Sequence, residues 1–189
     1  MLMKFNAASE RRKSRGTTPL DDERLRALAL TYVARYATTR AKLILYLNRK
    51  LRERGWTGEQ PADAGAIADR LVELSYIDDA AFARSKSNAL RQRGLGSYRI
   101  GATLKANGID GELAESFSRT EGEEALGLAA EYAKRRRIGP YTAAFPDDKL
   151  RSRWMAALMR AGHRGEDARR ILSLSFDEAE EARIVLKNL

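Results

Sequence analysis

The sequence predicts an all-α protein made of tandem three-helix repeats. Three observations lead to this fold class. Apolar residues recur at the three- and four-residue spacing of amphipathic helices along most of the chain. Capping residues and glycines punctuate these segments at short intervals. One pattern of two apolar residues and a glycine also returns along the chain, whereas the alternation typical of strands is nearly absent.

The first repeat is predicted from its helix start and stop signals. Thr18 suits an N-cap, and Pro19 follows it at the first helical position, where proline is tolerated. A second helix is predicted to start after Thr38 and Thr39 and to stop at Gly55. Pro61 and Asp63 are predicted to open a third helix.

The second repeat is predicted to open at Asp78, again as an N-cap. Ile77 then falls at N′ and Phe82 at N4, the spacing of a hydrophobic staple. Asp79 in the first turn should interact favourably with the helix dipole. These residues predict a helix end followed at once by a new helix.

Further helices are predicted from the same kind of signal. Ser97 and Asp110 are expected to cap the next two helices. Thr120 and Glu123 have the spacing of a capping box, in which each side chain satisfies a backbone amide near the other. The following helix is expected to start after the pair Asp147 and Asp148.

A recurring spacing relates the predicted repeats to one another. Its three sets are Leu43, Leu47 and Gly55; Ile100, Leu104 and Gly108; and Trp154, Leu158 and Gly162. In the first set the glycine comes four residues late, which is about one extra helical turn. Each glycine stands where a helix-ending residue in the left-handed conformation is expected.

The chain is therefore predicted to have five parts. They are a basic flexible arm (1–17), three three-helix repeats (18–77, 78–119 and 120–175) and a C-terminal helical tail (176–189).

Composition favours an anionic partner and disfavours catalysis. The 189 residues carry 35 Lys and Arg against 26 Asp and Glu, a net charge of +9, although many basic proteins do not bind nucleic acid. The chain has no cysteine, and His163 is its single histidine, so the sequence offers no thiolate site and no multi-histidine site. His163, Trp56 and Trp154 are interpreted as packing residues. We expect no catalytic residue, no metal and no cofactor.

The cellular location of the protein is predicted from the short length of its apolar segments. No apolar run approaches the roughly 20 residues that cross a bilayer. The N-terminal residues lack the apolar core of a secretory signal. We therefore expect a soluble cytoplasmic protein without membrane contact.

Basic residues are the candidates for binding a partner. They gather on predicted helices of the first and second repeats, where the alternative for each is an ordinary solvated helix face. Tyr98 and Tyr46 could stack on bases, although helical spacing favours core packing for Tyr46. The candidate binding residues are Arg40, Arg49, Arg84, Arg91, Arg93, Tyr98, Arg99 and Lys105.

The segment from Leu74 to Ala83 resembles the bacterial RecX family, the regulators of the RecA recombinase. It contains the family's pattern of aromatic, aliphatic, acid, Asp, two variable residues, Phe and Ala. The resemblance extends from about Leu20 to Leu174, with Ser75 where the family usually has glycine and His163 where it usually has an aromatic residue. The residues interpreted as its structural signature are Tyr76, Asp78, Asp79, Phe82, Gly94, Gly108 and Gly162.

The resemblance implies an elongated, curved array of three-helix repeats that binds the RecA–DNA filament. It implies that the protein lies in the groove of the filament and damps filament growth, ATP hydrolysis and strand exchange. An elongated monomer can touch several successive RecA protomers, and its basic faces would meet acidic groove residues or exposed DNA. Two other functions stay open. One is a helix-turn-helix transcriptional regulator, with its turn between Gly94 and Ser97. The other is a helical scaffold for a different protein.

Overall fold

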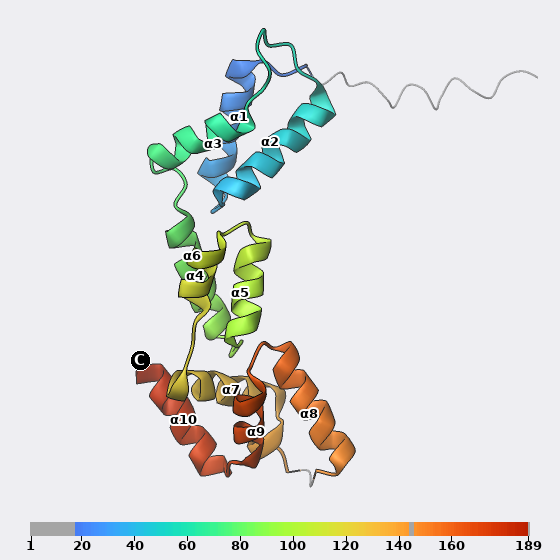
Figure 1. Cartoon of the computed structure of the whole chain (residues 1–189), viewed down its shortest axis with the longest axis vertical. Coiled ribbons are helices and arrows are strands. Elements are labelled where there is room, and N and C mark those ends of the chain that lie inside the picture. Colours follow the sequence, from blue (N-terminus) through green and yellow to red (C-terminus); the bar gives the residue numbers. More distant parts are fainter. Residues whose placement is uncertain (1–17, 144–145, 189) are drawn as a thin grey trace, which may run out of the picture. The chain divides into compact units, whose positions relative to one another are not determined.

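In a computed structural model, residues 18–143 and 146–188 are described and form two compact units. The first unit is Met1–Ile77 and the second is Asp78–Leu189. The predicted basic arm, residues 1–17, lies outside the described residues. Figure 1 shows that the described elements are helices, so the predicted all-α class is confirmed. Their bounds are α1 Asp22–Arg35, α2 Arg40–Arg54, α3 Ala64–Glu73, α4 Asp79–Arg91, α5 Ser97–Ala106, α6 Gly111–Ser118, α7 Gly122–Arg136, the 3₁₀ turn η2 Gly139–Tyr141, α8 Asp148–Arg160, α9 Gly165–Ser173 and α10 Phe176–Asn188.

The first unit packs α1, α2 and α3 around one hydrophobic core. The recurring residues Leu43 and Leu47 are fully buried in this core, as the spacing predicted. Truncating either leucine to alanine should cost about 2–5 kcal/mol, the usual range for a buried leucine. The other buried members of the cluster are Leu20, Leu25, Ala29, Ala64, Ala68, Leu71 and Ile77.

The start of the first helix differs from the prediction. Asp21 is the N-cap of α1, and its carboxylate accepts from the amide of Arg24 at 2.9 Å. Leu20 is instead held in an extended pairing with the segment after α2. Its amide donates to the carbonyl of Gly55 at 3.0 Å, and its carbonyl accepts from the amide of Thr57 at 2.8 Å. Those long-range bonds keep Thr18 and Pro19 out of the helix.

Among the described residues, five helices end in the same hydrogen-bonded turn, the Schellman motif. In each, a residue with positive φ donates its amide three positions back, and the next residue donates five positions back. The positive-φ residues of these turns are Ser75, Gly94, Gly108, Arg137 and Gly162. The three glycines confirm the predicted stops. At Ser75 and Arg137, a side chain occupies a conformation that costs about 1–2 kcal/mol for residues other than glycine.

The helix starts were predicted with mixed success. Asp78 and Asp110 cap α4 and α6 through their carboxylates, as predicted, and Asp147 caps α8 in the same way. The prediction for Ser97 was wrong, because Gly96 is the N-cap of α5 and no side chain caps this helix. The capping box at residues 120–123 was also wrong, since α7 begins at Gly122 without a side-chain cap.

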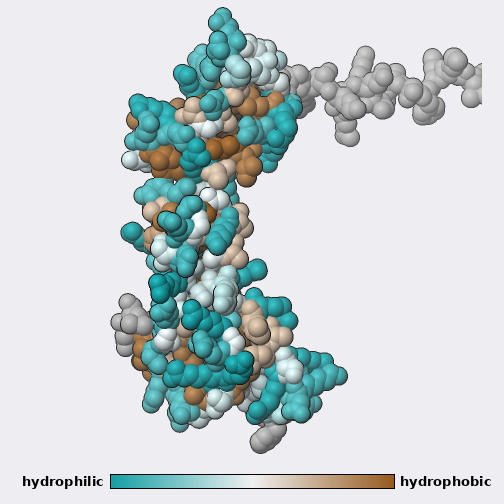
Figure 2. Space-filling view, viewed as in Figure 1, coloured by the Kyte–Doolittle hydropathy of each residue, from teal (hydrophilic) through white to brown (hydrophobic). Residues whose placement is uncertain are grey.

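The second unit contains two clusters of buried residues. One lies among α4, α5 and α6 and includes Ile100 and Leu104, and the other lies among α7, α8, α9 and α10 and includes Trp154 and Leu158. These four residues come from the recurring pattern, and each is buried. Figure 2 shows hydrophilic residues over most of the visible face of this unit, as expected when the apolar stripe of each helix turns inward.

The C-terminal helix is part of the core of the second unit. Helix α10 runs along α7 (Figure 1), and Ala179 and Ala182 are buried in the same cluster as Trp154. A Cβ atom added at Gly127 of α7 would overlap the α10 side chain of Leu186 and the backbone of Ala182. The absence of a side chain at Gly127 therefore lets the two helices approach closely.

The two residues of the predicted staple, Ile77 and Phe82, belong to the cores of the two units. Ile77 is buried in the core of the first unit. Phe82 is half-buried against the cluster that contains Ile100. Each residue thus anchors one side of the joint at Asp78 in a different core.

Candidate functional site

The turn after α4 and the turn after α8 meet backbone to backbone inside the second unit. The amide of Gly96 donates to the carbonyl of Ala161 at 3.0 Å, and the amide of Tyr98 donates to the carbonyl of Gly162 at 3.2 Å. A Cβ atom at Gly96 would overlap the Gly162 backbone, and one at Gly162 would overlap Arg99. Gly96 and Gly162 therefore join two helical turns, and we call this contact the turn joint.

His163 completes the turn joint as a buried packing residue. Its side chain is 4% exposed, and its ring lies 5.8 Å from the ring of Tyr132. Its Nε2 atom lies 3.0 Å from the carbonyl oxygen of Gly94. Burial lowers the pKa of His163 to about 4, and the hydrogen bond with the Gly94 carbonyl opposes this only in part. The ring is therefore neutral at physiological pH, which fits a Nε2–H donor to that carbonyl.

Arg91 and Arg40 are used within the fold. Nε of Arg91 lies 3.1 Å from a carboxylate oxygen of Glu124, close enough for an ion pair although not aligned for a hydrogen bond. Its Nη2 donates to the carbonyl of Arg119 at 3.1 Å. Arg40 on α2 forms a two-pronged ion pair with Asp69 on α3, with one bond of 3.0 Å. Both guanidinium groups hold helices together. Because they are already paired within the fold, they are less suited to binding a partner.

The remaining candidates in the second unit are exposed. Arg93, Arg99 and Lys105 have exposed side chains, and Tyr98 is 67% exposed. Tyr98 and Lys105 are seven positions apart on α5, so they share one face of that helix. Arg84 is exposed on α4, and its guanidinium carbon lies 5.9 Å from the centre of the Phe117 ring. These residues leave charge and aromatic surface accessible to a partner.

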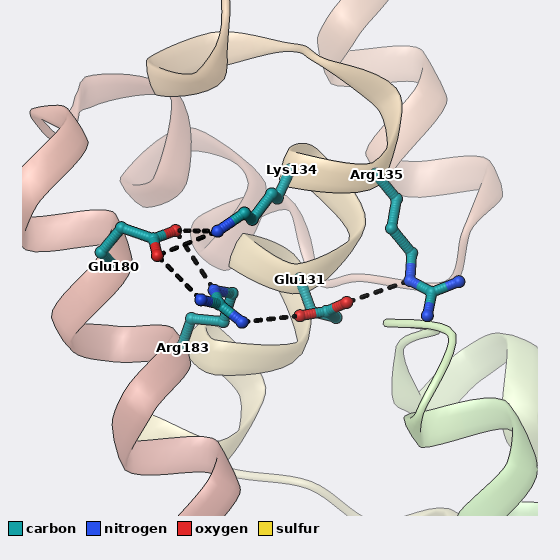
Figure 3. A network of polar contacts seen from close by, with 5 residues as sticks. All are labelled: Glu131, Lys134, Arg135, Glu180 and Arg183. Carbon is teal, nitrogen blue, oxygen red and sulfur yellow. Dashed lines mark hydrogen bonds and ion pairs between the residues drawn. The ribbon is translucent and has the colours of Figure 1, made fainter.

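An ion-pair network holds α10 to α7 in the second unit (Figure 3). Glu180 accepts from Lys134 at 3.0 Å and from Arg183 at 2.8 Å. Arg183 also lies 3.5 Å from Glu131, which accepts from Arg135 at 3.0 Å. The bonds from Arg183 and then Lys134 lower the pKa of Glu180 to about 2. Glu180 therefore stays charged at any physiological pH.

A cleft of about 870 Å³ lies beside this network, between α4, α7 and α10. Its basic lining residues are Arg91, Arg135 and Arg183, and each faces a carboxylate of the same unit. Because those charges are compensated, the cleft does not favour an anion. Its walls mainly serve to pack the helices.

The first unit holds a cluster that the sequence reasoning missed. Arg49, a predicted candidate, is exposed on α2 beside the rings of Tyr46, Tyr32 and Tyr36. Tyr32 and Tyr36 continue the helical spacing of Leu25, Leu28 and Ala29, so the sequence pattern alone places them on the apolar face of this helix. The pairing of two tyrosines one turn apart with a basic second helix was the signal that could have revealed this site.

Within the described residues, no group of three or more His, Cys, Asp or Glu is arranged to hold a metal ion. None of the helices in the described ranges combines the length and apolar character needed to cross a bilayer.

Comparison with known proteins agrees with this description. The family model for RecX, second three-helix domain, matches residues 78–116. Proteins named Regulatory protein RecX are similar to this chain in Myxococcus xanthus (30% identity; 71% of this chain and 76% of the relative) and Chlorobaculum tepidum (32% identity; 86% and 96%). The crystal structure of RecX from Lactobacillus salivarius shares the fold, with a TM-score of 0.54 and 18% identity over 88% of this chain and 97% of that chain.

The described helices define an all-α protein that contains a three-helix domain. The sequence identity to these relatives, and the share of the chain that it covers, show that the chain belongs to the RecX family of regulatory proteins.

Proposed function

We propose that this protein binds the RecA–DNA filament and restrains its growth, ATP hydrolysis and strand exchange. The observation that carries the proposal is membership of the RecX family, whose second three-helix domain matches α4, α5 and most of α6. The net charge of +9 supports an anionic partner. Several weak contacts from repeated helical segments would add up to useful avidity on a polymer of identical subunits.

The contact surface in the second unit is assigned to Arg84, Arg99 and Lys105. All three are exposed on α4 or α5. Arg91 is left out of this surface because it is paired with Glu124. Exposed cations meeting acidic groups or phosphates make binding sensitive to salt, since screening weakens charge pairs at the surface.

The structure of the turn between Gly94 and Ser97 argues against the helix-turn-helix alternative. A recognition helix places its N-terminal residues against base edges in the major groove. Gly96, at the N-terminus of α5, is buried and bonded to Ala161. The approach of a duplex to this end of α5 would therefore have to displace the turn joint.

The proposal is tested by co-sedimentation with RecA filaments assembled on single-stranded DNA. We expect the full-length protein to pellet with the filaments and to be released as salt is raised. Charge reversal of Arg84, Arg99 and Lys105 together should weaken pelleting. Reversal of Arg24, Arg70 and Arg119, which are exposed and paired with local carboxylates, is the matched control. Absence of the wild-type protein from the pellet at low salt would contradict the proposal.

A further inference from the structure

The first unit carries a shallow hollow in which tyrosines and cations alternate. The hollow has a volume of about 410 Å³ and lies between the end of α1 and the middle of α2. We call it the tyrosine–basic hollow. Its lining residues are Thr31, Tyr32, Arg35, Tyr36, Tyr46, Arg49 and Lys50.

The aromatic part of the hollow is a short stack with an exposed end. The rings of Tyr32 and Tyr46 are stacked, with centroids 4.2 Å apart and planes 18° apart. The ring of Tyr36 lies 5.2 Å from that of Tyr32 and is tilted by 48°. Tyr36 is 57% exposed, whereas Tyr32 and Tyr46 are half-buried against the core. The inner pair thus anchors the stack, and Tyr36 presents aromatic surface to solvent.

The cations of the hollow are not fully compensated. The guanidinium carbon of Arg49 lies 5.6 Å from the Tyr46 ring centre, and Nζ of Lys50 lies 5.9 Å from it. Both side chains pair with Glu53, at 3.7 Å for Arg49 and 2.6 Å for Lys50. Arg35 adds a third positive charge at the end of α1. No carboxylate is among the residues that line the hollow within the described chain, so positive charge is in excess.

Core packing accounts for only part of this arrangement. It explains Tyr32 and Tyr46, and the dipole of α1 favours a basic residue in its last turn, where Arg35 lies. Neither reason explains why Tyr36 is 57% exposed beside three cations. An exposed aromatic face next to a positive groove is how proteins bind unpaired bases and the adjoining phosphates.

We propose that the tyrosine–basic hollow binds single-stranded nucleic acid, with a base stacked on Tyr36 and phosphates near Arg35, Arg49 and Lys50. A base in a duplex has both faces covered by its neighbours, so the stacking contact selects an unpaired strand. An acidic protein would use the cations but would gain little from the exposed ring. The hollow contains no feature assigned to the sugar, so DNA and RNA strands are both accepted.

The proposal is tested by fluorescence anisotropy with the full-length protein alone. Labelled thymidine and uridine oligomers of about 20 nucleotides cover the contact length of a small domain. Tyr36→Ala should weaken binding about 5- to 150-fold, the range for loss of one stacked base, and Tyr36→Phe should retain it. The matched control is Tyr76→Ala, which removes another exposed tyrosine of the first unit. Circular dichroism checks that each variant is folded.

The salt dependence of binding tests the contribution of the cations in the hollow. Arg35→Ala and Arg49→Ala should each make the plot of log affinity against log salt shallower by about 0.7, the value for one phosphate contact on a single strand. Arg70→Ala, which removes an exposed and paired cation of the same unit, should leave the slope unchanged. Equal losses for Tyr36→Ala and Tyr76→Ala would overturn the proposal, as would a duplex or an acidic peptide that binds as tightly as the oligomer. Because RecA is absent, such a failure would leave the proposed filament binding standing.

Discussion

A methyl group on Gly96 would overlap the backbone of Gly162, and one on Gly162 would overlap Arg99 in the first turn of α5. This contact joins the α4–α5 turn to the α8–α9 turn within the second unit. Gly162 also has a φ of 93°, a conformation that favours glycine. Both glycines are therefore required by close approach, and Gly162 by backbone conformation as well.

We expect Gly96→Ala to destabilise the second unit by about 2–4 kcal/mol, because overlap with backbone atoms cannot be relieved by a side-chain rotation. Gly111→Ala is the matched control, since nothing lies within 4 Å of a Cβ at that position. The control should be neutral or slightly stabilising. Urea unfolding followed through Trp154, which lies in the second unit, measures both effects. Equal stability of the two variants would show that the turn joint can open at little cost.

The buried imidazole of His163 predicts a loss of stability in mild acid. Its pKa falls from 6.5 to about 4 on folding, so the unfolded chain binds the proton more tightly. The contribution of neutral His163 is complete above pH 6.5 and is lost as the pH falls toward 4. Between pH 7 and pH 5 this group should remove about 2 kcal/mol of stability.

The variant His163→Phe checks this pH dependence, because phenylalanine fills the site beside Tyr132 without a titrating group. Its unfolding free energy, read from Trp154 in urea, should change less than that of the wild type between pH 7 and pH 5. Parallel pH profiles for the two proteins would mean that other groups cause the loss.

Ser75 occupies the C′ position of α3 with a φ of 60°. Glycine adopts this conformation without the steric cost that a side chain incurs, so Ser75→Gly should stabilise the first unit by about 0.5–1 kcal/mol. Ala66→Gly, at an exposed position inside α3, should instead destabilise it by about 0.5–1 kcal/mol. Trp56 fluorescence in urea reports on this unit. A loss of stability in Ser75→Gly would contradict the assignment of strain to this turn.

Arg91 should behave as a structural residue. Its side chain is 24% exposed, and its removal would leave Glu124 half-buried without its partner. Arg91→Ala is therefore expected to cost about 1–3 kcal/mol in the second unit, measured through Trp154. Arg93→Ala, an exposed neighbour, should change stability by no more than about 0.5 kcal/mol. If the arginine instead serves mainly for binding, its removal will spare stability and weaken filament pelleting.

Local signals predicted much of the fold. Asp78 and Asp110 were identified as caps because a cap depends on a few neighbouring residues. Ser97 was misassigned because the amide of Gly96 donates to the carbonyl of Ala161. The local sequence cannot reveal this long-range hydrogen bond. The start of α1 was missed for the same reason, since Leu20 pairs with the segment after α2.

The candidate surface could be predicted less completely than the fold. Helical spacing indicated which cations face solvent, and Arg84, Arg99 and Lys105 are exposed. It could not indicate that Arg40 meets Asp69 or that Arg91 meets Glu124, because these partners come from other helices. The tyrosine–basic hollow was missed because it forms only when α1 and α2 pack together.

The most direct test of the proposed function is the DNA-dependent ATPase of RecA, measured while this protein is added in substoichiometric amounts. We predict that ATP turnover falls well before the protein equals RecA in concentration, because one bound molecule that blocks filament growth affects many subunits. The variant with Arg84, Arg99 and Lys105 reversed should inhibit less than the wild type at the same salt concentration. Unchanged ATP turnover at every ratio of wild-type protein to RecA would contradict the proposal.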